Sequence, residues 1–171
     1  IKLVFVGRLS YQKGLDRVLN LFSNIKNVEF IIIGEGPQRK KLEDFVKKNK
    51  LQKKITFYGF ISKPYNIIAG SDYFLLPSRW EGMPNCVLEA LALGTPVIAF
   101  EEIESLKDFT VNLKNKTITL VKNNKSMLKL LNSLQPRKDN LNPKLRNSLL
   151  NKPLSETTYR KKLDKIISSI L

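Results

Sequence analysis

The stretch that decides the fold is residues 72–100, DYFLLPSRWEGMPNCVLEALALGTPVIAF. It begins with an apolar run at Tyr73–Leu76, passes through a loop into a helical pattern at Val87–Leu93, and ends in a second apolar run at Thr95–Phe100. Neither run alternates apolar with polar residues, which is typical of parallel strands that are covered on both faces. The stretch therefore predicts a strand, a helix and a second parallel strand.

The same alternation extends in both directions from this stretch. Further strands are predicted at residues 1–6, 28–33, 55–58 and 117–121. Helices are predicted at residues 15–25, around 42–46, at 64–69 and at 125–134, with a short one near 144–150 and a terminal one at about 155–170. Strands and helices that alternate with short links predict an α/β fold, a Rossmann-like doubly wound parallel sheet. Ligands of such sheets bind at the carboxyl ends of the strands, so the loops to inspect are 7–14, 34–38, 59–63, 77–86 and 100–109.

Composition excludes several classes of protein. The length of 171 residues suits one domain, and no apolar run approaches the ~20 residues of a membrane-spanning helix. The chain starts inside a predicted strand, so we expect it to be part of a larger protein. The single cysteine, Cys86, excludes an internal disulfide framework and predicts a cytoplasmic location. The chain has no histidine, which excludes histidine-based acid–base catalysis within it.

The net charge of +15 is spread over the whole chain. It favours either a plain lysine-rich surface or attraction to anionic lipid, which would place the protein at the inner face of a membrane. Nucleic acid is not expected as a partner, because the sequence has no zinc-finger spacing or aromatic-rich binding motif.

The loop after the first strand carries two cations between two glycines, in Gly7-Arg8-Leu9-Ser10-Tyr11-Gln12-Lys13-Gly14. Arg8 can bind phosphate oxygens through its planar fork, with Lys13 as a point charge beside it. Glycine allows the backbone to approach a ligand closely. The loop indicates a phosphate site, and its ordinary alternative is a solvated basic turn.

The loop of residues 77–86 opens a helix, and two glutamates eight positions apart, Glu81 and Glu89, flank its glycine-containing part. The backbone amides of a helix start attract anions. A carboxylate would repel the same anion, so the two glutamates are better suited to accept hydrogen bonds from sugar hydroxyls. Each glutamate alone could instead be an ordinary charge at a helix N-terminus.

Other residues near the strand ends carry weaker signals. Gly34-Glu35-Gly36 lacks the third glycine of a dinucleotide fingerprint and is interpreted as a tight turn. Phe60 is expected in the core, with a base pocket as the alternative, and Trp80 is either packing or pocket wall. Cys86 lies at a helix start, which can lower a thiol pKa, but the chain has no histidine to act as its base.

Taken together, the motifs resemble the family 4 retaining glycosyltransferases, which have the two-domain GT-B fold. The resemblance covers residues 3–100 and rests on FVGRLSYQKGLDRVL, FIIIGEGPQRKKLE, ITFYGFI and the stretch quoted first. It implies that the chain, residues 1–171, is the C-terminal domain that binds a nucleoside-diphosphate sugar. The N-terminal acceptor domain would then be absent from this chain.

The resemblance also implies a role for each matching residue. Arg8 and Lys13 match the basic pair that grips the donor diphosphate, Glu81 orients the donor sugar, and Glu89 takes the ribose hydroxyls. The backbone at Phe60 lies against the base. The remaining donor-binding positions are in the glycine loops and the helix start: Gly7, Gly82, Met83, Asn85 and Cys86. Arg8, Lys13 and Glu81 are the expected catalytic residues, and no metal or cofactor is implied.

The implied activity is hexosyl or N-acetylhexosaminyl transfer to a saccharide or lipid-linked acceptor in bacterial surface glycan synthesis. The donor is expected to be a UDP-sugar, with a GDP-sugar as the second choice, and the fragment alone is expected to be inactive. The sequence departs from the family after Phe100, where EEIESLKDFTVNLKNKTITL has no glycine. The alternatives are a non-catalytic module that binds nucleotide-sugars or polyanions, and half of a GT-B-fold epimerase. A Rossmann oxidoreductase is disfavoured by the incomplete glycine pattern.

Overall fold

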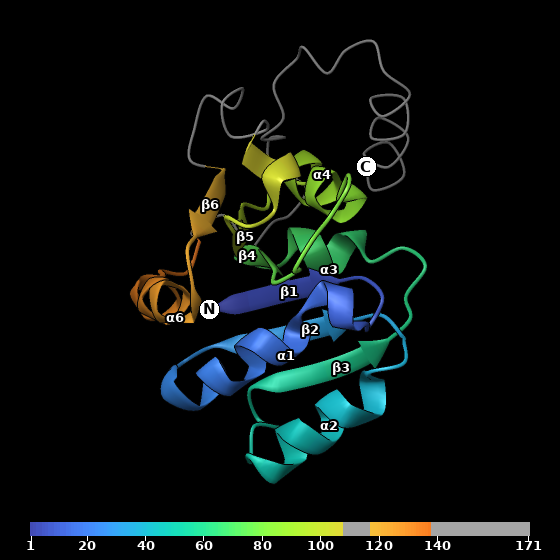
Figure 1. Cartoon of the computed structure of the whole chain (residues 1–171), viewed down its shortest axis with the longest axis vertical. Helices are drawn as coiled ribbons and strands as arrows, with labels where there is room; N and C mark the ends of the chain where they lie inside the picture. The colour runs from blue at the N-terminus through green and yellow to red at the C-terminus, as the bar shows by residue number, and fades with distance from the viewer. Residues whose placement is uncertain (108–116, 138–171) are drawn as a thin grey trace.

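A six-stranded parallel sheet forms the centre of the protein in its computed structural model, which describes residues 1–107 and 117–137 (Figure 1). The strand order is β3-β2-β1-β4-β5-β6, and every neighbouring pair is parallel. The strands are β1 (Lys2–Val6), β2 (Glu29–Ile33), β3 (Ile55–Gly59), β4 (Tyr73–Leu76), β5 (Val97–Phe100) and β6 (Ile118–Val121). This order is that of a Rossmann-type doubly wound sheet, so the predicted fold class is confirmed.

The strand order reverses between β1 and β4. The chain first winds outward from β1 through β2 to β3, and then returns across the sheet to place β4 on the other side of β1. Connections diverge at this point and leave a crevice beyond the carboxyl ends of the two strands. The loops that follow β1 and β4 are therefore the ones that the fold places around a ligand.

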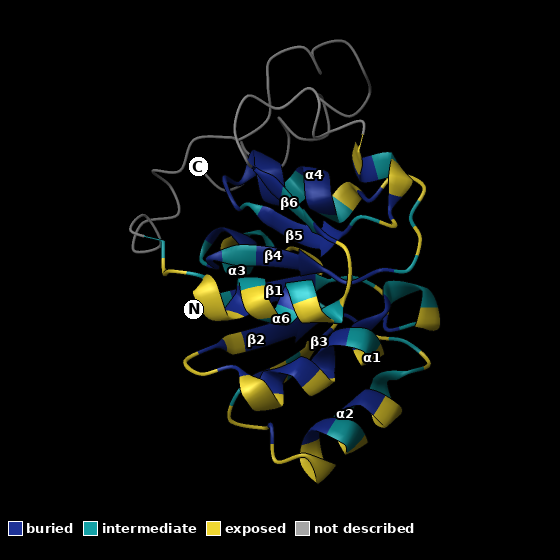
Figure 2. Ribbon diagram, turned by 60° about the vertical axis from the view of Figure 1, so that its left-hand side comes forward, coloured by how far each residue is buried: buried dark blue, intermediate teal, exposed yellow. Residues whose placement is uncertain are grey.

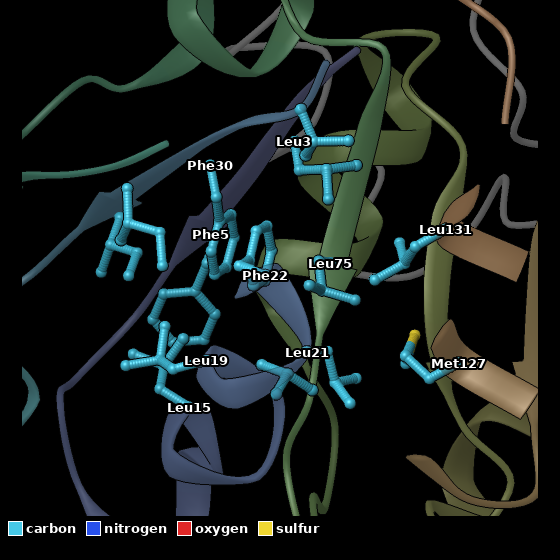
Figure 3. Packing of buried hydrophobic residues seen from close by; sticks show 14 of the residues in the cluster. Leu3, Phe5, Leu15, Leu19, Leu21, Phe22, Phe30, Leu75, Met127 and Leu131 are labelled. Atoms are coloured by element: carbon cyan, nitrogen blue, oxygen red, sulfur yellow. The ribbon is translucent and has the colours of Figure 1, made fainter. Parts of the chain in front are cut away.

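Both faces of the sheet are buried, and each has its own core. In β1, Leu3 and Phe5 belong to one core and Val4 to the other, and the other inner strands divide in the same way. Figure 3 shows the first core, where the rings of Phe22 and Phe30 are stacked with centroids 4.9 Å apart. Apolar side chains are thus required on both faces, which explains why the strands read as continuous apolar runs.

The helices form the two outer layers. The first core is covered by α1 (Leu15–Val18), the 3-10 helix Leu19–Asn24, α2 (Arg39–Lys48) and α6 (Asn124–Ser133). The second is covered by α3 (Tyr65–Ala69) and α4 (Asn85–Ala92). Figure 2 shows the strands mostly buried and the outward faces of the helices exposed. No helix in the described part of the chain is long and apolar enough to cross a membrane.

Two predicted elements differ from the structure. The helix predicted at residues 15–25 is α-helical only to Val18 and continues as a 3-10 helix. Its second half contains Asn20, Ser23 and Asn24, which are weak helix formers. The fifth strand begins at Val97, because the amide of Thr95 donates to Ala90 at the end of α4. The helices predicted near 144–150 and at 155–170 lie outside the described residues.

Candidate functional site

The loops after β1 and β4 are bonded directly to each other at the reversal of strand order. The amide of Arg79 donates to the carbonyl of Gln12 at 2.8 Å, and the side chain of Gln12 donates to the carbonyl of Trp80 at 3.1 Å. Gly14 has a φ of 63°, and a Cβ at this position would stand 2.2 Å from the carbonyl oxygen of Pro77. Only glycine therefore allows the two loops to approach this closely.

Lys13 and Glu81 form an ion pair at the junction of these loops. The Lys13 Nζ lies 2.6 Å from Oε1 of Glu81, and the hydroxyl of Ser78 donates to the same oxygen at 2.6 Å. The side chains of Lys13 and Glu81 are only 17% and 6% exposed. Within the described residues Oε2 of Glu81 makes no hydrogen bond, so one carboxylate oxygen is left to accept a bond from a ligand.

Arg8 behaves differently from Lys13. Its side chain is exposed and makes no ion pair or hydrogen bond with any other described residue. It lines a pocket of about 280 Å³ at the carboxyl ends of β1, β2 and β3, together with Gly7, Glu35 and Phe60. The site thus combines one cation that is already paired with one that has its full charge available for an anion.

Phe60 is on the surface and not in the core, so that prediction from the sequence was wrong. Its side chain is 76% exposed. Gly59 ends β3 with a φ of 74°, a left-handed conformation that turns the chain out of the sheet before Phe60. Trp80 is also exposed, and its side chain is no part of the buried core.

The start of α4 brings Cys86 and Glu89 to the same place as Lys13 and Glu81. Burial raises the pKa of the Cys86 thiol to about 12; Glu81 and Glu89 add to the rise, and Lys13 opposes it. Burial, followed by the charge of Glu89, also raises the pKa of Tyr65. A helix start can lower a thiol pKa, but burial is the larger effect on Cys86 and raises it.

We expect native Cys86 to react with iodoacetamide at pH 8 about a thousandfold more slowly than in the unfolded chain, because the thiolate is the reactive form. Since the chain has no other cysteine, the total mass increase with time measures this rate. The control is the same reaction in guanidinium chloride. Rapid native labelling would show that the thiol is ionised and not held neutral by burial.

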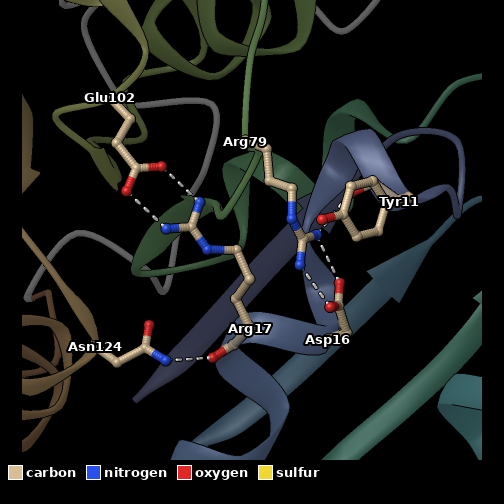
Figure 4. A network of polar contacts seen from close by, with 6 residues as sticks. All are labelled: Tyr11, Asp16, Arg17, Arg79, Glu102 and Asn124. Carbon is tan, nitrogen blue, oxygen red and sulfur yellow. Dashed lines mark hydrogen bonds and ion pairs between the residues drawn. The ribbon is translucent and has the colours of Figure 1, made fainter.

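A second set of polar contacts, which the sequence did not predict, also joins the loop after β4 to the segment that follows β1 (Figure 4). Arg79 pairs with both carboxylate oxygens of Asp16 at 2.7 and 2.9 Å, and its guanidinium lies 3.8 Å from the centre of the Tyr11 ring. The hydrogen bond from Arg79 holds the pKa of Asp16 below its ordinary value. The sequence placed Arg79 in the loop of residues 77–86, but no pattern in it connected Arg79 with Asp16.

The glycine-free segment after Phe100 is also bonded to the site. Glu102 accepts two hydrogen bonds from Arg17, both at 3.0 Å (Figure 4). The Arg17 guanidinium also lies 4.1 Å from the centre of the Phe100 ring. The hydroxyl of Ser105 donates to the backbone carbonyl of Glu81 at 3.2 Å. Glu102 and Ser105 therefore join the segment after Phe100 to Arg17 and to the backbone of Glu81.

The turn at Gly34-Glu35-Gly36 is hydrogen-bonded to the loop after β1. The amide of Leu9 donates to the carbonyl of Glu35 at 2.8 Å, and the amide of Gln38 donates to the carbonyl of Leu9 at 2.9 Å. A Cβ on Gly34 would stand 1.9 Å from the carbonyl oxygen of Gly7. These glycines allow backbone packing behind Arg8, in agreement with the interpretation of this segment as a tight turn.

The geometry suits a ligand that carries an anion and hydroxyl groups. The cations Arg8 and Lys13 and the amides at the start of α4 provide positive charge, and the carboxylates of Glu81 and Glu89 provide acceptors. Across residues 1–107 and 117–137 no three carboxylate or thiol side chains gather as metal ligands would. Arg8, Lys13, Glu81 and Glu89 were all predicted as site residues. The structure pairs Lys13 with Glu81, and the charges of these two residues and of Glu89 act on the thiol of Cys86. Arg8 lines the pocket at Gly7, and a Cβ on Gly7 would stand 3.6 Å from the Lys13 side chain.

Comparison of the sequence with known families gives a match over residues 1–149 to the family described as "Glycosyl transferases group 1". Among curated proteins, the chain is 32% identical over 129 residues to the O-antigen biosynthesis glycosyltransferase WclY of Escherichia coli. The aligned region covers 70% of this chain and 36% of WclY. The chain thus spans about a third of the length of this relative.

Solved structures show the same fold at low sequence identity. The lipopolysaccharide outer core galactosyltransferase WaaB, in its apo form, matches with a TM-score of 0.71 at 20% identity, over 99% of this chain and 49% of that one. Anabaena HepE in complex with UDP matches with a TM-score of 0.69 at 16% identity, over 99% of this chain and 47% of that one. The architecture is thus shared with two proteins about twice as long, one of them a galactosyltransferase.

Proposed function

This chain belongs to the group 1 glycosyl transferases, and on that premise we propose that it is the donor-binding, C-terminal half of a retaining, metal-independent family 4 enzyme. The observation that carries the proposal is the position of Arg8. It is an exposed guanidinium without a partner among the described residues, and it follows the first strand at the reversal of strand order, beside the Lys13–Glu81 pair. Such a group is available to a diphosphate.

Each part of a nucleoside-diphosphate sugar has a counterpart in the site. Arg8, Lys13 and the amides of Asn85 and Cys86 at the start of α4 bind the two phosphates. The free oxygen of Glu81 accepts a bond from a sugar hydroxyl, beside the loop of Gly82 and Met83. Glu89 accepts bonds from the ribose, and the backbone at Phe60 borders the base, in the pocket that Gly7 also lines.

The chemistry is stabilisation of a leaving group. When the bond between the sugar and the diphosphate breaks, negative charge grows on the phosphate oxygens, and fixed positive groups lower the energy of that state. The Lys13 side chain is held by Glu81, whereas for Arg8 only the backbone is positioned, through the packing of the preceding Gly7 on Gly34. The acceptor attacks from the face that the diphosphate leaves, which retains the configuration.

The donor is proposed to be a UDP-sugar, with a GDP-sugar as the second choice, and no cofactor takes part. UDP is bound in the similar HepE structure, and O-antigen biosynthesis is the role in the name of WclY. We therefore place this enzyme in bacterial surface glycan synthesis, with hexose or N-acetylhexosamine transferred to a saccharide or lipid-linked acceptor. The acceptor would dock against an N-terminal domain outside this chain. The protein would be cytoplasmic, with the inner face of the membrane as a further contact.

The proposal is tested by thermal stabilisation with UDP, GDP, ADP and NAD. A nucleoside diphosphate at a hundred times its dissociation constant should stabilise the folded chain by about 2.7 kcal/mol. We expect UDP to raise the melting temperature, and Arg8→Ala to lower the affinity for UDP at least about tenfold with little change in the melting temperature of the free protein. The reason is that the Arg8 side chain makes no hydrogen bond or ion pair with residues 1–107 or 117–137, the part of the chain that the structure describes.

The matched control is Lys48→Ala, which removes an exposed cation at the last residue of α2, the end opposite to the one that adjoins the Arg8 pocket. It should bind UDP as the wild type does. If Lys48→Ala and Arg8→Ala weaken binding equally, and if binding disappears at high salt for every nucleotide, the chain is a general polyanion binder. The donor site would then be rejected.

A further inference from the structure

Two aromatic side chains remain exposed beside the proposed donor site. Tyr11 is 58% exposed and Trp80 is 54% exposed, and their ring centroids lie 6.2 Å apart with planes inclined at 57°. We call Tyr11 and Trp80 the aromatic pair. Because the two rings are neighbours, they form one continuous exposed apolar surface, and such surfaces are typical of binding sites.

Polar contacts hold the Tyr11 ring in place and position the backbone of Trp80 beside it. The Arg79 guanidinium lies against one face of the Tyr11 ring and also donates to the Tyr11 carbonyl at 2.7 Å. Asp16 in turn fixes the guanidinium through two hydrogen bonds, as Figure 4 shows. The backbone of Trp80 is held by Gln12. Rings that are fixed in advance lose little conformational entropy when a ligand binds them.

The aromatic pair lies on the same two loops as the buried ion pair of the donor site. Trp80 directly precedes Glu81, yet its side chain is largely exposed while that of Glu81 is 6% exposed. Tyr11 likewise comes two residues before Lys13, which pairs with Glu81. The two loops thus carry a buried ion pair and, next to it in the sequence, two rings that are exposed to solvent. The base is proposed to lie by Phe60 after β3, and β2 and β1 separate β3 from β4.

We propose that the aromatic pair is a subsite for a pyranose ring of the acceptor saccharide, an assignment that rests on the proposed function. A pyranose has a face of C–H groups, whose partial positive charge is attracted to the negative face of an aromatic ring. Its hydroxyl groups need polar partners at the edge, and Gln12, Asp16 and Arg79 surround the rings. An aromatic surface with a charged rim suits a sugar better than it suits a lipid chain.

The subsite can be tested on this chain because Trp80 is its only tryptophan. Its emission is recorded while maltotriose or chitotriose is added at millimolar concentrations, with and without saturating UDP. We expect a saturable change in emission that persists in the presence of UDP, and a matching shift of the one indole signal in a ¹H–¹⁵N spectrum. Tyr11→Ala should weaken this binding about fivefold or more, because it removes one ring of the pair.

Tyr58→Ala is the matched control, because Tyr58 is 52% exposed but lies on β3, at the edge of the sheet. It should bind the saccharides as the wild type does, and UDP should stabilise both tyrosine variants. If UDP stabilises the chain but neither trisaccharide changes the Trp80 signals, the subsite is rejected and the donor site stands. Loss of saccharide binding in the presence of UDP would place the sugar in the donor pocket and also reject the subsite. A chain that binds neither UDP nor saccharide counts against both proposals.

Discussion

Replacing Lys13 with methionine is expected to lower the free energy of unfolding by about 3 kcal/mol and to remove detectable binding of UDP. The substitution leaves the carboxylate of Glu81, which is 6% exposed, with Ser78 as its only side-chain partner in the described part of the chain. A buried charge that loses its counter-ion is strongly destabilising. Binding is lost because one of the two cations is removed while an uncompensated negative charge remains beside the phosphates.

The experiment is urea denaturation of the wild type, Lys13→Met, Glu81→Gln and the double variant. The double variant should be more stable than Lys13→Met alone, because it no longer buries an unpaired charge. It should still fail to bind UDP, whereas Arg8→Ala should lose binding without losing stability. Equal stability of Lys13→Met and the wild type would mean that the pair is solvated and does not organise the site.

Replacing Gly34 with alanine should have the largest structural effect, a loss of about 4 kcal/mol or more, or failure to fold. Gly34 has a φ of 139°, and the added Cβ would stand 1.9 Å from the carbonyl oxygen of Gly7. The obstacle is backbone and not the flexible end of a side chain, so relief requires the loop after β1 to move. Because Arg8 follows Gly7, the same movement would displace the proposed phosphate-binding guanidinium.

Gly82→Ala is the matched control for this prediction. Gly82 does not have a positive φ, and a Cβ placed there meets no atom within 4 Å. Its free energy of unfolding should therefore stay within about 0.5 kcal/mol of the wild type. Both variants are compared by thermal and urea denaturation. A Gly34→Ala variant as stable as Gly82→Ala would show that the turn can separate from the loop after β1 without loss of the fold.

Much of the fold could be predicted because the relevant information is local. The apolar runs at residues 28–33 and 73–76 are strands in which successive side chains enter opposite cores, as the absence of alternation indicated. The strand order around β1 depends on long-range pairing, which the sequence does not display directly. The end of α1 at Val18 was missed because apolar spacing alone does not distinguish an α-helix from a 3-10 helix.

The candidate site was predicted as a set of residues but not as a set of contacts. Arg8, Lys13 and Glu81 were recognised from their positions after predicted strands, and the fold brings their loops together. The pairing of Arg79 with Asp16 joins two surface charges that no local pattern connects. Phe60 was misplaced because hydrophobicity predicts burial only on average, and the left-handed turn at Gly59 directs it outward.

The contacts between the loops after β1 and β4 also bear on when a growing chain could form the proposed nucleotide site. Leu3 pairs with Tyr73, Lys13 bonds to Glu81 across 68 positions, and Asp16 bonds to Arg79 across 63. Closing segments of this length costs chain entropy before the contacts compensate for it. During synthesis, β1, β2 and β3 can therefore leave the ribosome and begin to pair while the crevice still lacks one wall. Nucleotide recognition would begin only once β4 and the loop that follows it have emerged.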